Sequence, residues 1–133
     1  EWEYCCRAGT TTAYSFGDKA QAKGDTGKKA GLLDPFGWHN GNAAGNDPPV
    51  GALKPNPWGL YDVHGNVWEW CSDWYGKYPP GKQRDPKGPD SGEMRVLRGG
   101  SWFVNAWFTR SVSRACDTPE ERDHSRGFRL AGD

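Results

Sequence analysis

Four cysteines and three histidines are the residues of this 133-residue chain most suited to redox, nucleophilic or transition-metal chemistry. Cys5 and Cys6 are neighbours, Cys71 and Cys116 stand apart, and no spacing matches a metal-binding motif. A bond between adjacent cysteines is strained, so in a disulfide-bonded protein Cys5 and Cys6 would each need a different partner. Buried or idle reduced thiols are the simpler expectation. The histidines do not form a metal-spaced set either; they are His39, His64 and His124.

A second stretch, residues 95–130, carries groups suited to molecular recognition. It opens on RGGSW, closes on GFRL, and follows neither a helical nor a strand period between them. Aromatic rings such as Phe103, Trp107 and Phe108 give a binding surface large contact area at a low entropic cost. Short polar residues beside them would supply adaptable hydrogen bonds. The alternative is that these rings are ordinary core residues.

Composition excludes several classes of function. Seventeen basic and seventeen acidic residues cancel, so no overall charge favours nucleic acid or an anionic membrane. No apolar run approaches the ~20 residues that span a bilayer, and no secretory signal is visible, so the sequence predicts no compartment. A low apolar content of 35%, with 19 glycines, 10 prolines and 8 tryptophans, favours a loop-rich fold with an aromatic core.

The elements that must position these groups are short. Residues 1–9 are typical of the last turns of a helix closed by a glycine, and residues 10–18 of a short strand. Residues 19–29 predict a solvated loop. The segment 56–76 predicts short strands that bury tryptophans and bond their indole N–H groups to backbone carbonyls. The tryptophans expected in the core are Trp68, Trp70, Trp74 and Trp102, and the glycines expected at positive φ are Gly65, Gly99 and Gly100.

Four motifs in order then point to a family. EWEYCCRAGT, NPWGLYDVHGNVWEWCSDWYG, RVLRGGSW and GFRL resemble the formylglycine-generating enzyme family, whose domain is a variant of the C-type lectin fold. The resemblance implies an α+β, loop-rich domain with short strands and little helix over residues 1–133. Because the family's fold begins upstream with a strand and a helix, its N-terminal part is expected to be missing.

The resemblance also implies what chemistry to look for. The enzyme that names the family oxidises a substrate cysteine with oxygen and a copper ion held by two cysteine thiolates, which suit Cu(I). The matching positions here are Val104 and Thr109, and neither side chain binds copper. Cys116 alone does not replace a pair. Oxidase activity is therefore not expected, and no cofactor is required.

Residues 95–130 also resemble the variable region of diversity-generating retroelement proteins, which display mutagenised positions on this scaffold near the C terminus. In that comparison a constant frame separates positions of mixed chemistry. The frame residues are Ala106, Arg110, Ser111, Arg114, Pro119 and Arg122. The positions predicted to contact a ligand are Phe103, Val104, Asn105, Trp107, Phe108, Ser113, Ala115, Asp117, Glu121, Asp123 and His124. The frame arginines are expected to bond loop carbonyls or carboxylates.

Members of the family with a segment like LYDVHGNVWEW bind a structural Ca²⁺. Carried over by motif, the ligands here are the side chains of Asp62 and Glu69 and the carbonyls of Gly65 and Val67. Hard oxygen donors of this kind suit calcium. The alternative is that Asp62 caps a turn and Glu69 pairs with an arginine.

Three functions follow from these observations. The first is a non-catalytic domain that binds an unknown protein or other macromolecule, not nucleic acid, through a diversified surface. The second is a metal-dependent oxidase of the formylglycine-generating or sulfoxide synthase kind, the latter drawing its iron ligands mainly from another domain. The third is an accessory domain in which residues 95–130 are merely packed, so that the three aromatics are buried.

Overall fold

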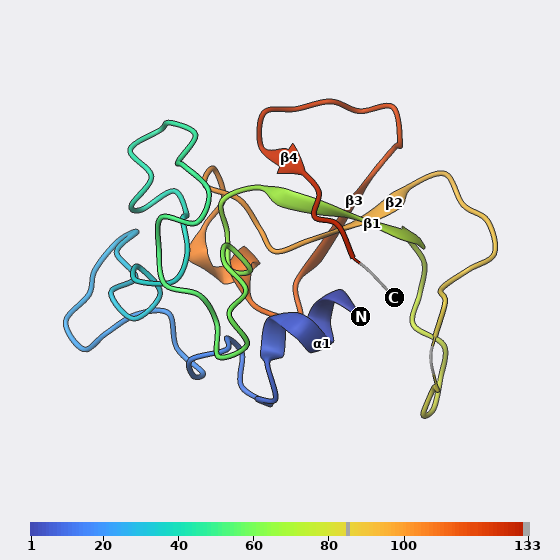
Figure 1. Ribbon diagram of the computed structural model, residues 1–133, viewed down its shortest axis with the longest axis horizontal. Helices are drawn as coiled ribbons and strands as arrows, with labels where there is room; N and C mark the ends of the chain where they lie inside the picture. Colours follow the sequence, from blue (N-terminus) through green and yellow to red (C-terminus); the bar gives the residue numbers. More distant parts are fainter. Residues whose placement is uncertain (85, 132–133) are drawn as a thin grey trace.

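The computed structural model describes residues 1–84 and 86–131, and its centre is a small mixed sheet (Figure 1). The strands are β1 (Trp68–Trp74), β2 (Arg95–Arg98), β3 (Arg114–Asp117) and β4 (Arg126–Gly127), in the order β3-β2-β1-β4. β2 is antiparallel to both of its neighbours, whereas β4 runs parallel to β1. Most of the described chain is irregular, so the sheet serves to hold long loops in place.

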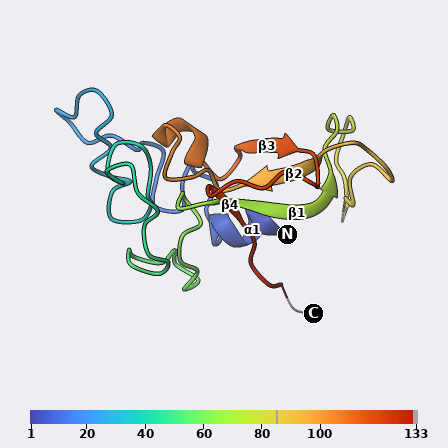
Figure 2. The ribbon, with the colours of Figure 1, turned by 90° about the horizontal axis from the view of Figure 1, so that it is seen from above.

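The helix α1 (Trp2–Arg7) packs beneath this sheet (Figure 1 and Figure 2). The indole of Trp2 donates to the Glu69 carboxylate at 2.6 Å, which ties the helix to β1. The predicted helix is confirmed, although Ala8 rather than a glycine is the first residue in the left-handed conformation, at φ 48°.

The strand predicted over residues 10–18 is wrong. This segment forms a single bridge between Tyr14 and Gly17. Its backbone groups bond elsewhere: the Ala13 carbonyl accepts from the Ser111 N–H at 2.9 Å, and the Ser15 N–H donates to His64 at 3.0 Å. The β-branched composition favours a strand, but no neighbouring strand of the described chain pairs with this segment. Long-range hydrogen bonds determine its backbone conformation instead.

The tryptophans divide into two kinds. Trp68 and Trp102 are buried as predicted, whereas Trp70 and Trp74 are only half-buried. The guanidinium of Arg95 covers the ring of Trp74 at 3.5 Å, which explains how that ring sits at the edge of the sheet. The predicted indole bond to a carbonyl is wrong for Trp102, whose buried N–H has no partner among the described residues.

Two glycines are required where loops approach each other closely. A Cβ on Gly65, at φ 132°, would lie 2.0 Å from the Trp38 carbonyl oxygen. A Cβ on Gly100, at φ 77°, would lie 2.7 Å from the Thr109 side chain. Their positive φ angles confirm the prediction, and Gly100 sets how tightly the chain after the RGGSW motif packs.

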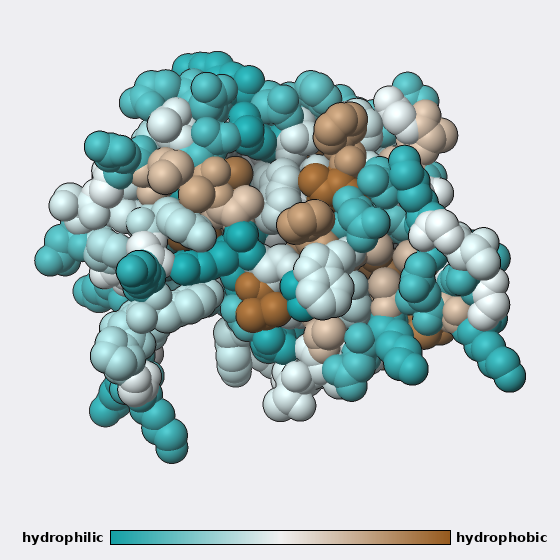
Figure 3. All heavy atoms as spheres, turned by 180° about the vertical axis from the view of Figure 1, so that it is seen from behind, coloured by the Kyte–Doolittle hydropathy of each residue, from teal (hydrophilic) through white to brown (hydrophobic). Residues whose placement is uncertain are grey.

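The four cysteines are free thiols, as expected. Among the described residues, no helix has the length and apolar character to cross a membrane. The face drawn in Figure 3 carries its apolar side chains in small groups separated by hydrophilic ones.

Candidate ligand-binding surface

The segment that follows the RGGSW motif turns through a short 3-10 helix, η1 (Ala106–Thr109). Asn105 caps it, because its side-chain oxygen accepts from the Trp107 N–H at 2.9 Å. Residues three apart share a face of such a helix. Ala106 and Thr109 consequently face the interior, with Thr109 fully buried.

The intervening residues point outward. Trp107 and Phe108 are 61% and 50% exposed, and Phe103 just before the turn is 67% exposed. This exposure contradicts the packed accessory domain, which required the three rings to be buried. Large apolar rings left in water at one short turn are typical of a binding surface.

Buried polar contacts hold η1 from beneath. The Tyr14 hydroxyl donates to the Ala106 carbonyl at 3.0 Å, and His64 Nδ1 donates to the Thr109 carbonyl at 2.9 Å. The Ser111 hydroxyl lies 3.5 Å from the Cys6 thiol. Because a carbonyl only accepts, His64 carries its proton on Nδ1 and accepts from the Ser15 N–H through Nε2.

Burial determines the charge states of this support. It lowers the pKa of His64 to about 4, partly opposed by the bond to the Thr109 carbonyl, so the imidazole is neutral near pH 7. Burial raises the pKa of the Cys6 thiol to about 12, with a smaller lowering by its bond to Ser111. Cys6 is therefore a packed thiol rather than a nucleophile.

Arginines fix η1 and the chain that follows it. Arg98, buried in β2, donates to the Ser111 and Val112 carbonyls at 2.9 and 3.2 Å. Arg110 donates to the Trp107 carbonyl at 2.9 Å, and Arg114 to the Gly76 carbonyl at 2.6 Å. The predicted bonding of frame arginines to loop carbonyls is confirmed at these last two positions.

The remaining predicted contact residues fall into two groups. Phe103 packs edge-on against Trp102, whose other neighbour is the exposed ring of His124, so the 121–125 loop lies beside the aromatic turn. Asp117 instead pairs with Arg126 at 2.5 Å within the sheet and is half-buried. Of the other positions, the exposed ones are Asn105, Glu121 and Asp123, and the half-buried ones are Val104, Ser113 and Ala115.

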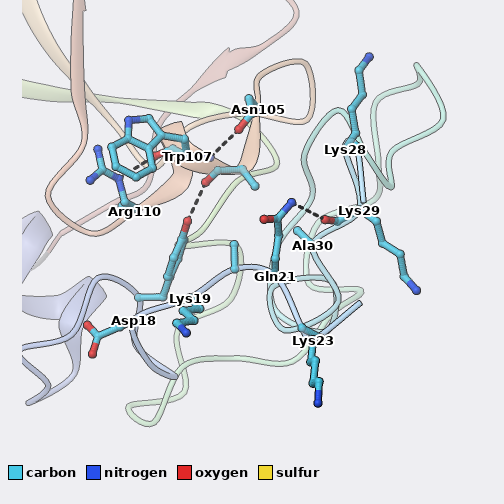
Figure 4. Close-up of a pocket in the computed structure, with 15 residues that line it drawn as sticks. Asp18, Lys19, Gln21, Lys23, Lys28, Lys29, Ala30, Asn105, Trp107 and Arg110 are labelled. Atoms are coloured by element: carbon cyan, nitrogen blue, oxygen red, sulfur yellow. Dashed lines mark hydrogen bonds between the residues drawn. The ribbon is translucent and has the colours of Figure 1, made fainter. Parts of the chain in front are cut away.

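A cavity of about 700 Å³ opens beside η1 (Figure 4). One wall is formed by Asn105, Trp107 and Arg110, and the other by the loop at residues 18–30. The predicted solvent exposure of that loop is confirmed. Its position beside the aromatic turn was not predicted. The contact joins residues some eighty positions apart, and no local pattern signals it.

The calcium site implied by the motif is only partly matched by the geometry. Asp62 Oδ1 is buried without a hydrogen-bond partner among the described residues, which suits a metal ligand. Its other oxygen accepts from the Gly51 N–H at 2.7 Å. Both oxygens of Glu69 are bound, by Trp2 and by Arg129 at 2.5–2.6 Å.

Asp62 therefore fits calcium, whereas Glu69 as placed does not. Calcium binding stays a prediction for the set of Asp62 and Glu69 side chains with the Gly65 and Val67 carbonyls. Isothermal titration with Ca²⁺ tests it: heat of binding that disappears in Asp62→Ala is expected if the site exists. The absence of any heat of binding would contradict the calcium site and support the alternative, in which Glu69 pairs with Arg129.

The two positions that match the family's copper ligands carry no metal-binding side chain. Val104 and Thr109 have no thiol or imidazole, and Cys116 contacts Met94 on the sheet. His39 pairs with Asp34 at 2.8 Å, so the three histidines lie in three separate environments. Within residues 1–84 and 86–131, no group of three or more His, Cys, Asp or Glu side chains is placed to hold a metal ion.

The fold and this surface can now be compared with known proteins. A family model described as the sulfatase-modifying factor enzyme 1-like domain matches residues 1–133. The chain belongs to this family. The formylglycine-generating enzyme of Mus musculus is 38% identical over 141 residues, covering all of this chain and 37% of that protein. The enzyme of the same name from Thermomonospora curvata is 34% identical over 156 residues, covering all of this chain and 47% of that protein.

Two solved structures share the fold of this chain. Treponema denticola variable protein 1 superposes with a TM-score of 0.82 at 35% identity, covering 96% of this chain and 43% of that one. PvdO from Pseudomonas aeruginosa gives 0.77 at 28% identity, with 96% and 48% covered. The predicted loop-rich α+β fold of C-type lectin type and the resemblance to a variable protein are both confirmed. The chain spans less than half the length of each of these relatives.

Proposed function

We propose that this sulfatase-modifying factor domain is a non-catalytic binding module that recognises a protein or other macromolecule through the surface at Phe103–Ser125. The observation that carries the proposal is the two-sided turn η1. Trp107 and Phe108 face solvent, while Tyr14 and His64 hold the backbone of that turn from the interior. Rings already held in position lose little entropy on binding, so more of their contact energy appears as affinity.

Two further observations support a diversified receptor. The similarity to a variable protein covers almost the whole chain. The buried positions of the turn, Ala106 and Thr109, maintain its shape, whereas the exposed rings lie half or more in solvent, so we expect their replacement to cost little stability. We further propose that diversification by a retroelement acts on these exposed positions; a near-identical template repeat beside the gene, differing mainly at adenines, tests this.

The alternative is an oxidase like the formylglycine-generating relatives. The residues at the copper positions argue against it, since Val104 and Thr109 offer no soft ligand. In the test for this arm, the protein is supplied with copper and oxygen, and a cysteine-containing peptide is analysed by mass spectrometry. No conversion of the cysteine to an aldehyde is expected.

Selection from a phage-displayed library of random peptides tests the binding function. Peptides selected on the purified protein are expected to lose about tenfold or more in affinity for Trp107→Ser and Phe108→Ser. Val50→Ser, which replaces an apolar side chain 82% exposed on another loop, is the matched control. Selection of no peptide, or of peptides indifferent to both aromatic substitutions, would contradict the proposal.

A further inference from the structure

The cavity beside Trp107 has a positively charged rim that the aromatic surface alone does not explain. Lys19, Lys23, Lys28 and Lys29 line it from one side and Arg110 from the other. The lysines are exposed, and their side chains extend outward from the loop in Figure 4. The whole chain is electrically neutral, so this excess of positive charge is local.

Most of this charge is not neutralised within the protein. Lys29 pairs with Asp25 at 3.3 Å, and that carboxylate also accepts from the backbone of the same loop. For Lys19, Lys23 and Lys28, no carboxylate of the described part of the chain lies within ion-pair distance. Among the described residues, Asp18 has the only carboxylate that lines the cavity, and this carboxylate accepts from the Ala13 N–H at 3.1 Å.

Arg110 is placed to act as a fixed donor at the opposite wall. Its guanidinium lies over the Trp107 ring, 3.4 Å from the centroid, and its Nε donates to the Trp107 carbonyl. Stacking and this bond orient the planar group. Its terminal nitrogens have no other hydrogen bond within the described residues, so they are available to a carboxylate in the paired geometry that arginine favours.

We propose that this cavity receives an acidic segment of a partner protein. One carboxylate of the segment bonds Arg110, and apolar atoms of the segment lie against Trp107. Further acidic residues of the segment lie near Lys19, Lys23 and Lys28. This inference rests on the proposed function, and it adds the 19–30 loop to the binding surface. The volume, about 700 Å³, lies in the range of sites that enclose small ligands or side chains.

Charge and shape together favour an acidic protein segment over a nucleic acid. A strand of phosphates needs a continuous basic track and stacking rings along it. Here the lysine side chains leave the loop in different directions rather than along one track (Figure 4), and the cavity beside them has an apolar wall of Tyr14, Ala20, Ala30 and Ala106. Such a mixture matches acidic side chains interspersed with apolar ones, and the rim charges accelerate association with them.

The composition of the selected peptides is the first readout of the test. The library used above is selected on the protein, and enrichment of Asp and Glu over the starting library is expected. The affinity of an enriched acidic peptide is then measured for the triple variant Lys19→Gln, Lys23→Gln and Lys28→Gln. We expect a loss of about tenfold that shrinks as salt is added. The control is Lys54→Gln, Lys77→Gln and Lys82→Gln, which changes the net charge equally at other exposed lysines.

Arg110 gives a second, independent readout. Arg110→Lys keeps the charge but removes the paired donors, so a loss of several-fold for the same peptide supports the proposed carboxylate contact. Thermal melting of each variant verifies that it is folded.

The outcomes separate this inference from the proposed function. Peptides that require Trp107 but show no acidic enrichment, or that bind the lysine variant unchanged, overturn the acidic partner and leave the binding function standing. Selected peptides that bind equally well without the Trp107 ring overturn both the acidic partner and the proposed binding function. A random single-stranded oligonucleotide that binds as tightly as the peptide, with the same dependence on the lysines, overturns the protein segment in favour of a general polyanion site.

Discussion

The two walls of the cavity beside Trp107 are built in opposite ways. The η1 wall is fixed from inside the protein, where Tyr14, His64 and Arg98 bond its backbone carbonyls or those just after it. The wall at residues 18–30 is held by contacts within the loop itself: the Asp25 carboxylate accepts from two backbone N–H groups of this segment and pairs with a lysine in it. The first wall presents the Trp107 ring and the second presents lysines. Shape is therefore specified by the interior on one side, and charge is supplied by a surface loop on the other.

The largest effect on stability is expected at a glycine in the loop that supports η1, because that position leaves no room for a side chain. Gly65→Ala places a methyl 2.0 Å from the Trp38 carbonyl oxygen, so the loop that carries His64 must move. We expect a loss of more than about 3 kcal/mol in the free energy of unfolding, measured by urea denaturation. Gly45→Ala is the control, since it also has a positive φ but meets nothing within 4 Å. Equal losses for the two variants would mean that backbone strain alone acts.

The second effect is a pH dependence of the η1 support. The pKa of His64 is lowered from 6.5 to about 4 by burial, so between these values the unfolded chain binds a proton that the folded chain does not. The contribution of His64 to the free energy of unfolding should fall as the pH drops through this window, by roughly 3 kcal/mol in all, and level off below about pH 4. Denaturation at intervals from pH 7 to 4 measures it. His64→Gln should flatten the slope, whereas His124→Gln at an exposed ring should not.

The third effect concerns one hydrogen bond beneath the aromatic rings. Tyr14→Phe keeps the ring but removes one of two donors to the Ala106 carbonyl, which also accepts from the Thr109 hydroxyl at 2.9 Å. The loss of this one bond should cost about 1 kcal/mol. The peptides selected on the protein should also bind more weakly, because η1 is then less firmly positioned. Tyr4→Phe, at a ring 69% exposed, is the control for both measurements. Weaker stability with unchanged peptide binding would separate the support of η1 from recognition.

The sequence predicted the η1 wall better than its opposite, and the reason is physical. The glycines of RGGSW act through their positive φ angles, and the arginines through several side-chain donors that bond carbonyls, so the roles of both follow from residue type. The outward position of Phe103, Trp107 and Phe108 followed from the absence of any period that would bury them. Burial of His64 beneath the turn was not predicted, because a single histidine in a glycine-rich loop gives no sign of its distant partners.

Residues 10–30 were predicted less well. A β-branched run predicted a strand there, but the Ser111 N–H and the His64 ring bond its backbone instead. The lysine loop was correctly predicted to be solvated, yet its place beside Trp107 depends on how two segments far apart in the chain pack together. Charge on a loop is visible in sequence, whereas the surface that this charge serves is not.

The smallest effect on overall stability is expected at Asp25, in the lysine wall. Its carboxylate accepts from the Ala22 and Gly31 N–H groups at 2.8 and 2.6 Å, and these bonds, with Lys29, hold its pKa below the usual range. Asp25→Ala should loosen the loop and speed tryptic cleavage after Lys23 and Lys28, while the melting temperature changes little. Asp47→Ala, in another exposed loop, is the control. If cleavage stays slow, the loop is held by the rest of the cavity wall, and both walls then owe their shape to the interior.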